Sequence, residues 1–177
     1  MSLVENRYAE ALINIAAEKA SIDEFLQDLG SFAHMYSSEP GFKDFLLNPQ
    51  NETGVKKNVV FTVYNGRVKP EIINFVSLLL DKGRIKYLPG IYEEFIKLAD
   101  QKRSILTINI LSAVPLGGEQ ISVIANKYQK LYNAVSVKTQ VKYDPGLIGG
   151  IRVVVGDKMT DASVKGRLRE LEQLLLK

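Results

Sequence analysis

Cysteine is absent from the 177 residues of this chain, and histidine occurs only once. Without cysteine there can be no disulfide, no cysteine-ligated zinc or iron–sulfur centre and no thiol catalysis. The single histidine, His34, lies in an apolar helical stretch, where packing or a surface position explains it better than catalysis. No cluster of carboxylates or lysines replaces these groups, so we expect no enzyme activity and no cofactor or metal.

Phosphate-binding glycine motifs and long apolar runs are also missing. Neither Gly-x-x-x-x-Gly-Lys-Ser/Thr nor Gly-x-Gly-x-x-Gly occurs. The 23 Lys and Arg against 20 Asp and Glu give a net charge of +3, too small alone to indicate a nucleic-acid partner. No apolar run approaches the roughly 18 residues of a membrane span, and residues 1–7 lack the pattern of a secretory signal. The sequence therefore predicts a cytosolic or peripheral protein with its mature amino terminus and no membrane span.

The first hundred residues have the apolar spacing of helices. Ser21 with Glu24 forms the pattern of a capping box, Pro70 is typical of a first helical turn, and Gly83 of a helix end. Six helices are predicted: residues 3–20, 22–36, 40–47, 53–64, 70–82 and 89–103.

Two of these helices have more apolar surface than one core requires. Residues 3–20 carry two apolar stripes about 130° apart, and residues 70–82 are apolar almost all round. Such helices are either central in a bundle or incomplete without a partner, and the pattern alone leaves both interpretations open.

The pattern changes near Ser104, where strands begin to alternate with helices. The resulting prediction is an α+β two-domain chain, with a six-helix bundle over residues 1–104 and a small α/β domain with a mixed sheet over residues 105–177. Within the second domain, strands are predicted at 104–113, 134–143, 147–155 and 158–160, with helices over 119–132 and after an N-cap at Asp161 or Ser163.

A basic cluster lies near the carboxyl terminus. Lys165, Arg167 and Arg169 accompany Arg152 and Lys158. The cluster is either a solvated helix face or a contact for an acidic partner.

Four stretches resemble the delta subunit family of F-type ATP synthases, called oligomycin-sensitivity-conferring protein in mitochondria. Residues 7–12 resemble its opening helix, 74–85 its fifth helix and the following turn, and 113–116 the exit from a strand. Residues 144–168, from Asp-Pro-Gly-Leu-Ile-Gly-Gly onward, resemble its carboxyl-terminal signature, which is long and specific.

The resemblance implies a non-catalytic stator subunit that links the catalytic head to the peripheral stalk. It would resist rotor torque during proton-driven ATP synthesis, at the cytoplasmic face of a bacterial cell membrane. Its first and fifth helices would form a groove for the amino-terminal helix of an alpha subunit, and its second domain would meet the stalk's b subunits. The matching groove positions are Tyr8, Ala11, Leu12, Ile15, Phe75, Leu78 and Leu79. The basic residues of the last helix, Lys165, Arg167 and Arg169, are the expected stalk contact.

An RNA-binding module is the main alternative from another class. Gly146-Leu147-Ile148-Gly149 matches the Gly-x-x-Gly loop of KH domains. That loop should join two helices and usually holds a basic residue, whereas here Leu-Ile fills it and a strand is predicted next. We therefore expect no nucleic-acid partner.

Overall fold

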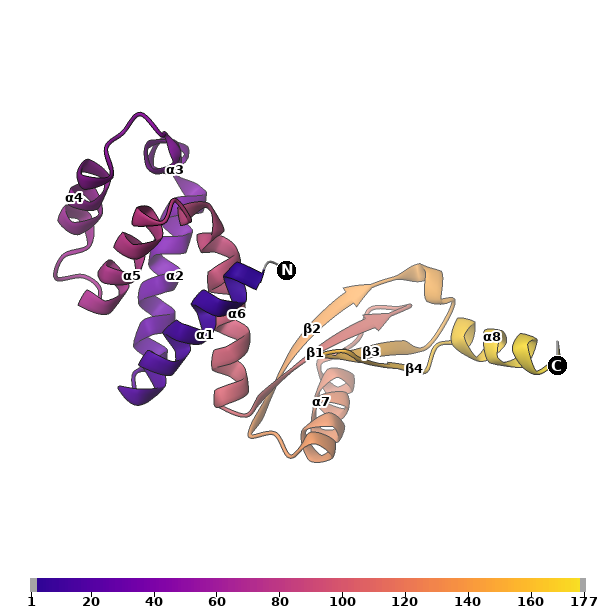
Figure 1. Ribbon diagram of the computed structural model, residues 1–177. Helices are drawn as coiled ribbons and strands as arrows, with labels where there is room; N and C mark the ends of the chain where they lie inside the picture. Colours follow the sequence, from indigo (N-terminus) through magenta and orange to yellow (C-terminus); the bar gives the residue numbers. More distant parts are fainter. Residues whose placement is uncertain (1–2, 176–177) are drawn as a thin grey trace. The chain divides into compact units, whose positions relative to one another are not determined.

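The computed structural model describes residues 3–175 and contains two compact units, one extending to Ala99 and the other beginning at Asp100 (Figure 1). Its described part is helix-rich, with eight α-helices and one mixed four-stranded sheet. Six α-helices precede the first strand and two follow it, at or close to the predicted positions. The two units are described separately below.

The first unit is built from helices around one apolar core. Phe25, Phe32 and Phe95 are almost completely buried there, and burying one such side chain stabilises the fold by roughly 1.5–3 kcal/mol. Pro40 and Pro70 occupy the first turn of their helices, where a missing N–H costs little. Its elements are α1 (Leu3–Glu18), α2 (Ile22–Ser38), α3 (Pro40–Leu47), α4 (Thr53–Tyr64), α5 (Pro70–Asp81), a 3-10 turn (Ile85–Tyr87) and α6 (Leu88–Lys102).

The predicted capping box at Ser21 is wrong. The Ser21 side chain makes no capping hydrogen bond to α2, and its buried hydroxyl has no partner among the described residues. The Ser21 N–H instead donates to the Ala16 carbonyl at 2.9 Å, and Ala20 has a φ of 48°. This arrangement closes α1 with a left-handed residue. Ser21 is still the N-cap residue of α2, since its carbonyl accepts from the Phe25 N–H at 3.0 Å, but its side chain does not cap the helix.

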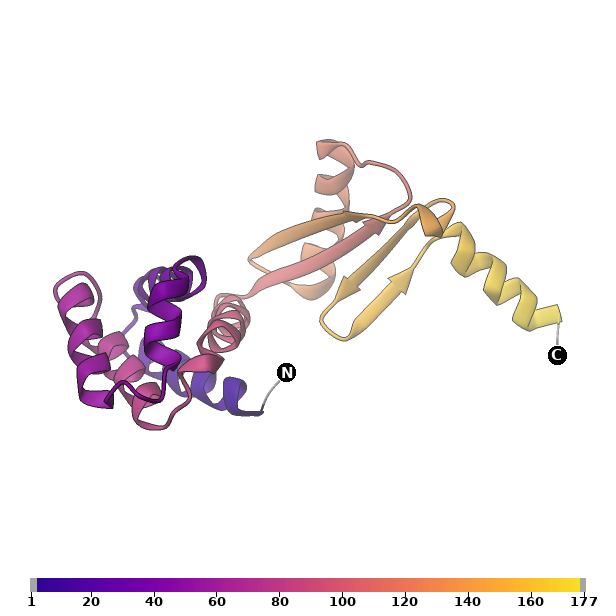
Figure 2. The same cartoon turned by 90° about the horizontal axis from the view of Figure 1, so that it is seen from above.

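The second unit contains the sheet, whose strands lie in the order β2-β1-β3-β4. The β1–β2 pair is parallel and is connected through α7, whereas β1–β3 and β3–β4 are antiparallel. Helix α7 covers one face of the sheet (Figure 2), and its Tyr128 is buried in one cluster with Ile108, Ile110 and Val153 of the strands. The elements are β1 (Ile105–Ser112), α7 (Gly118–Tyr132), β2 (Ser136–Tyr143), a 3-10 turn (Pro145–Leu147), β3 (Ile151–Val155), β4 (Lys158–Asp161) and α8 (Val164–Leu175).

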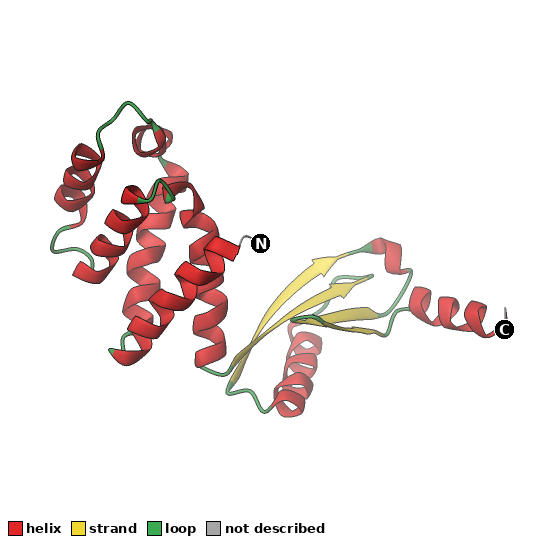
Figure 3. Cartoon of the chain, in the orientation of Figure 1, coloured by secondary structure: helices red, strands yellow, loops and turns green. Residues whose placement is uncertain are grey.

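The third strand begins later than the apolar run 147–155 predicts. Ile148 and Gly150 both have positive φ, 66° and 77°, which interrupts the extended conformation until Ile151 (Figure 3). A Cβ at Gly150 would lie 2.4 Å from the Ala162 carbonyl oxygen, so only glycine fits this close approach. The glycines of this stretch therefore serve the turn that precedes β3.

Candidate functional site

Helices α1 and α5 lie side by side and run in opposite directions. The Tyr8 ring meets the Phe75 ring edge-on, with centroids 6.0 Å apart. Toward the other end of the pair, Lys19 at the end of α1 forms an ion pair with Glu71 in the first turn of α5. These two contacts fix the helices that the sequence singles out as unusually apolar.

The predicted groove residues divide into exposed and buried members. Ile15 and Leu78 leave 41% and 43% of their surface exposed, on two helices that contact each other. Ala11 is exposed and Tyr8 is half-buried. We name Tyr8, Ala11, Ile15 and Leu78 the α1–α5 surface.

Three other predicted residues lie in the core beneath this surface. Leu12 and Leu79 are 1% and 0% exposed, and Phe75 is 8% exposed. Leu12 and Leu79 therefore pack within the first unit. Phe75 supports the α1–α5 surface from below through its contact with Tyr8.

Arg84, which sequence reasoning did not single out, completes this end of the site. Its Nη1 donates a hydrogen bond to the Tyr8 hydroxyl at 3.0 Å, and its guanidinium lies 5.7 Å from the centre of the Tyr8 ring. Arg84 follows Gly83 outside any helix, so no periodic pattern connects it with Tyr8. The only sequence signal is its place in the stretch 74–85 that resembles the family.

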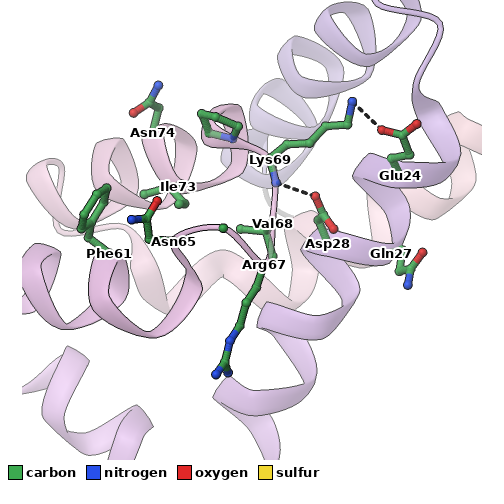
Figure 4. Close-up of a pocket in the computed structure, with 12 residues that line it drawn as sticks. Glu24, Gln27, Asp28, Phe61, Asn65, Arg67, Val68, Lys69, Ile73 and Asn74 are labelled. Atoms are coloured by element: carbon green, nitrogen blue, oxygen red, sulfur yellow. Dashed lines mark hydrogen bonds and ion pairs between the residues drawn. The ribbon is translucent and has the colours of Figure 1, made fainter.

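A pocket of about 660 Å³ lies elsewhere in the first unit, between α2 and the segment that joins α4 to α5 (Figure 4). Three of its charged residues, Glu24, Asp28 and Lys69, are in contact with one another. The Lys69 ammonium contacts Glu24, and the Lys69 backbone N–H donates to Asp28 at 2.7 Å (Figure 4). The hydrogen bond to Glu24 is the main cause that raises the pKa of Lys69. These contacts give Glu24, Asp28 and Lys69 a structural role, so none of the three is a candidate catalytic group.

The basic cluster near the carboxyl terminus does not act as one group. Arg152 is bound by Asp161 at 2.8 Å, and Lys158 lies 6.0 Å from the centre of the Tyr132 ring. The three basic residues of α8 are Arg167 and Arg169, both exposed, and Lys165, which is half-buried. None of these three has an ion-pair partner among the side chains that the structure describes.

The segment that begins α8 is organised by hydrogen bonds. Ser163 accepts a hydrogen bond from the Gly166 N–H at 3.0 Å, which confirms it as the predicted N-cap. The Gly146-x-x-Gly149 stretch lies between β2 and β3, partly in the 3-10 turn, and joins no pair of helices. The arrangement that a KH-type loop requires is therefore absent here.

No group of three or more His, Asp or Glu side chains able to hold a metal ion occurs in the described range. Among those residues there is also no helix long and apolar enough to cross a membrane.

Comparison with known proteins gives matches over nearly the whole chain. Residues 4–175 match the family described as ATP synthase delta (OSCP) subunit. The chain is 43% identical to ATP synthase subunit delta of Acetivibrio thermocellus, over 99% of both chains, and 36% identical to that of Ruminiclostridium cellulolyticum, also over 99% of both. It is 34% identical to the chloroplastic delta subunit of Emiliania huxleyi, over 95% of this chain and 93% of that one.

Solved structures share the fold. A chain in the Toxoplasma gondii mitochondrial ATP synthase hexamer superposes with a TM-score of 0.75 at 21% identity, covering 100% of this chain and 99% of that one. A chain in the Polytomella F-ATP synthase reaches a TM-score of 0.52 at 17% identity, covering 57% of this chain and 91% of that one.

Proposed function

Because this chain belongs to the ATP synthase delta (OSCP) subunit family, we propose which of its surfaces contact the other subunits. The protein is a non-catalytic subunit of an F-type ATP synthase and links the catalytic head to the peripheral stalk. Its first unit, a six-helix bundle, binds the amino-terminal helix of an alpha subunit through the α1–α5 surface. Its second unit binds the b subunits of the stalk, with Lys165, Arg167 and Arg169 of α8 in contact.

One observation carries the first contact: two large aliphatic side chains, Ile15 and Leu78, are exposed on neighbouring helices that are otherwise well packed. An amphipathic helix laid over them removes their apolar surface from water, which contributes roughly 25 cal/mol for each Å² buried. The firmly packed residues below, Phe75 and Leu79, keep the surface in place without a partner. Binding therefore carries little entropic cost for ordering the site.

The second contact is supported by charge. Arg167 and Arg169 are exposed on α8 and lack ion-pair partners among the described side chains, which suits an acidic stretch of the stalk. Held at both contacts, the subunit resists the torque that the turning rotor exerts on the head during proton-driven synthesis. Two linked contacts also hold more tightly than either alone. The subunit then works at the cytoplasmic face of a bacterial cell membrane.

The test of the head contact is a titration of the full chain with a synthetic peptide. The peptide has the sequence of the first twenty or so residues of the alpha subunit from the same complex. We expect Leu78→Asp to weaken binding at least about tenfold, because a carboxylate would be buried among apolar groups. The thermal unfolding midpoint should change little, since Leu78 is 43% exposed.

The neighbouring leucine supplies a matched control. Leu79 is 0% exposed, so Leu79→Asp should unfold the first unit and not merely weaken peptide binding. If Leu78→Asp also unfolds the protein, Leu78 is a core residue and the proposed head contact is wrong. Unchanged binding by a folded Leu78→Asp protein would contradict it equally.

A further inference from the structure

The segment that joins α4 to α5 contains the only Asn-Gly pair of the sequence, Asn65-Gly66. The two residues are the central pair of a type II turn, with φ of −58° and ψ of 127° at Asn65 and φ of 75° at Gly66. The Arg67 N–H closes the turn by donating to the Tyr64 carbonyl at 2.9 Å. The positive φ at the second central position explains why glycine follows the asparagine.

The side-chain amide of Asn65 and the backbone nitrogen of Gly66 are both accessible. The two residues are exposed and belong to the lining of the pocket beside α2 (Figure 4). Neither the Asn65 side chain nor the Gly66 N–H has a hydrogen-bond partner among the described residues. A Cβ placed on Gly66 would find nothing within 4 Å apart from the adjoining residues, so no neighbouring group shields its nitrogen.

We propose that Asn65 is a site of spontaneous deamidation, with the Gly66 nitrogen as the nucleophile. A base removes the proton of the Gly66 N–H, and the nitrogen attacks Cγ of Asn65. The new N–Cγ bond closes a five-membered imide, while the Cγ–Nδ2 bond breaks and Nδ2 takes a proton from water and leaves as ammonia. Water then opens the imide at either carbonyl, which gives aspartate or isoaspartate. The net reaction consumes one water molecule and releases one ammonia, and it is independent of the proposed head and stalk contacts.

Two other asparagines show what protects a side chain of this type. Asn133 is exposed as well, but the N–H that follows it, that of Ala134, donates to the Gln129 carbonyl at 3.0 Å. Asn58 lies inside α4, where the following N–H is bonded within the helix. Asn65 differs from both because the nitrogen after it is unbonded.

The turn controls the rate of the reaction. Ring closure requires the Gly66 nitrogen to approach the Asn65 side chain, whereas a ψ of 127° holds that nitrogen turned away from Cβ. The peptide between the two residues must therefore rotate, in competition with the hydrogen bond from Arg67 to Tyr64. We expect the folded turn to slow the reaction relative to the unfolded chain without stopping it, because the space around Gly66 is open.

The products change the connection between α4 and α5 in two ways. Both place a new negative charge in the lining of the pocket, and isoaspartate also adds one methylene to the backbone. The far end of the segment is fixed, since the Lys69 N–H donates to Asp28 at 2.7 Å. We therefore expect the isoaspartate form to unfold at a lower temperature than the freshly prepared Asn65→Asp protein, which carries the same charge on a backbone of normal length.

The test incubates the full chain in a mildly alkaline buffer and follows the tryptic peptide of residues 58–67 by mass spectrometry. This peptide contains both Asn65 and Asn58, and its fragments assign each gain of one mass unit to its residue. A sample digested at the start gives the background. We expect Asn65 to convert at least about tenfold faster than Asn58 in the folded chain, since the N–H after Asn58 is held in the helix. Equal rates at the two residues would overturn the proposal.

Urea and a matched variant complete the experiment. In urea, where the turn is lost, Asn65 should convert faster still, and in both states the rate should rise with pH because the deprotonated nitrogen is the nucleophile. The control is Asn65→Gln, which keeps an amide at the same place but would have to close a larger ring, so position 65 should stay unmodified. An Asn65 that converts in urea but stays intact in the folded chain would show that the turn protects it, and would refute the proposal.

Discussion

Asp161 connects β4 with the start of α8, and its carboxylate is strongly stabilised. The Ser163 side chain, then the Ser163 backbone N–H, and then Arg152 stabilise its charged form and lower the pKa of Asp161 from 3.8 to about 2. The Ser163 N–H donates at 3.0 Å and the Arg152 guanidinium at 2.8 Å. The carboxylate thereby holds together the strand pair β3–β4 and the cap of α8.

This shift predicts a pH dependence of stability. Because the folded pKa lies below the unfolded one, the stabilisation is complete above pH 3.8 and is lost as the pH falls toward about 2. We expect the unfolding midpoint of Asp161→Asn to lie below that of the wild type at neutral pH. The difference should shrink through this window. Thermal unfolding followed by circular dichroism at several pH values measures it, and a difference independent of pH would refute the linkage.

The candidate site shows what periodicity cannot resolve. The apolar excess on α1 and α5 indicated two helices with surface beyond the needs of one core. It did not distinguish Leu78 from Leu79, because a helix that is apolar almost all round has no polar face to orient it. Burial divides them: Leu79 lies in the core and Leu78 at the surface. The contact of Arg84 with Tyr8 could not be predicted from periodicity, since the two residues are 76 positions apart in the sequence.

At the scale of the helix, the residue that ends α1, Ala20, has a backbone conformation that suits glycine better than alanine. Ala20 has a φ of 48°, and the N–H groups of Ala20 and Ser21 donate to the carbonyls of Ala17 and Ala16 at 3.0 and 2.9 Å. This pair of bonds is the Schellman motif, in which the left-handed residue is usually glycine. An alanine there bears the steric cost of its Cβ.

We therefore expect Ala20→Gly to stabilise the first unit by about 0.5–1 kcal/mol. Glycine removes the steric cost of a Cβ in the left-handed conformation, and this gain exceeds the stability lost because glycine makes the unfolded chain more flexible. Urea unfolding of the full chain, monitored by the helical signal, measures the change. The matched control is Ala16, which is fully buried inside α1, so Ala16→Gly should destabilise the unit. A loss of stability in Ala20→Gly would mean that the turn does not require a left-handed residue.

The same turn explains why the predicted capping box at Ser21 is wrong. Ser21 and Glu24 have the spacing of a capping box, but the backbone of Ser21 is already committed to closing α1. Similarly, the apolar run from Leu147 predicted an extended strand, whereas positive φ at Ile148 and Gly150 delays β3 until Ile151. At Ser21 the hydrogen bonds that close α1 decide the conformation, and at Gly150 the close approach of the Ala162 carbonyl decides it.

At the scale of the whole chain, the order of elements could be predicted because most of them have a strong local signal, the valine-rich α4 being weaker. Proline begins α3 and α5, Gly83 follows the end of α5, and alternation marks β2. The pairing of strands into the order β2-β1-β3-β4 could not be predicted in the same way, since register depends on contacts between distant segments.

The core of the first unit is self-contained, which predicts that residues 1–104 fold alone. Its buried apolar residues run from Ala9 to Ala99 and include none from the sheet. Ending the fragment at Ser104 also retains all of α6, which continues to Lys102, so no helix is cut within a turn. We expect a helical circular dichroism spectrum and one cooperative urea transition, as is usual for single domains of this size. A fragment that is insoluble or unfolds without cooperativity would mean that the sheet-containing unit is needed to complete the bundle.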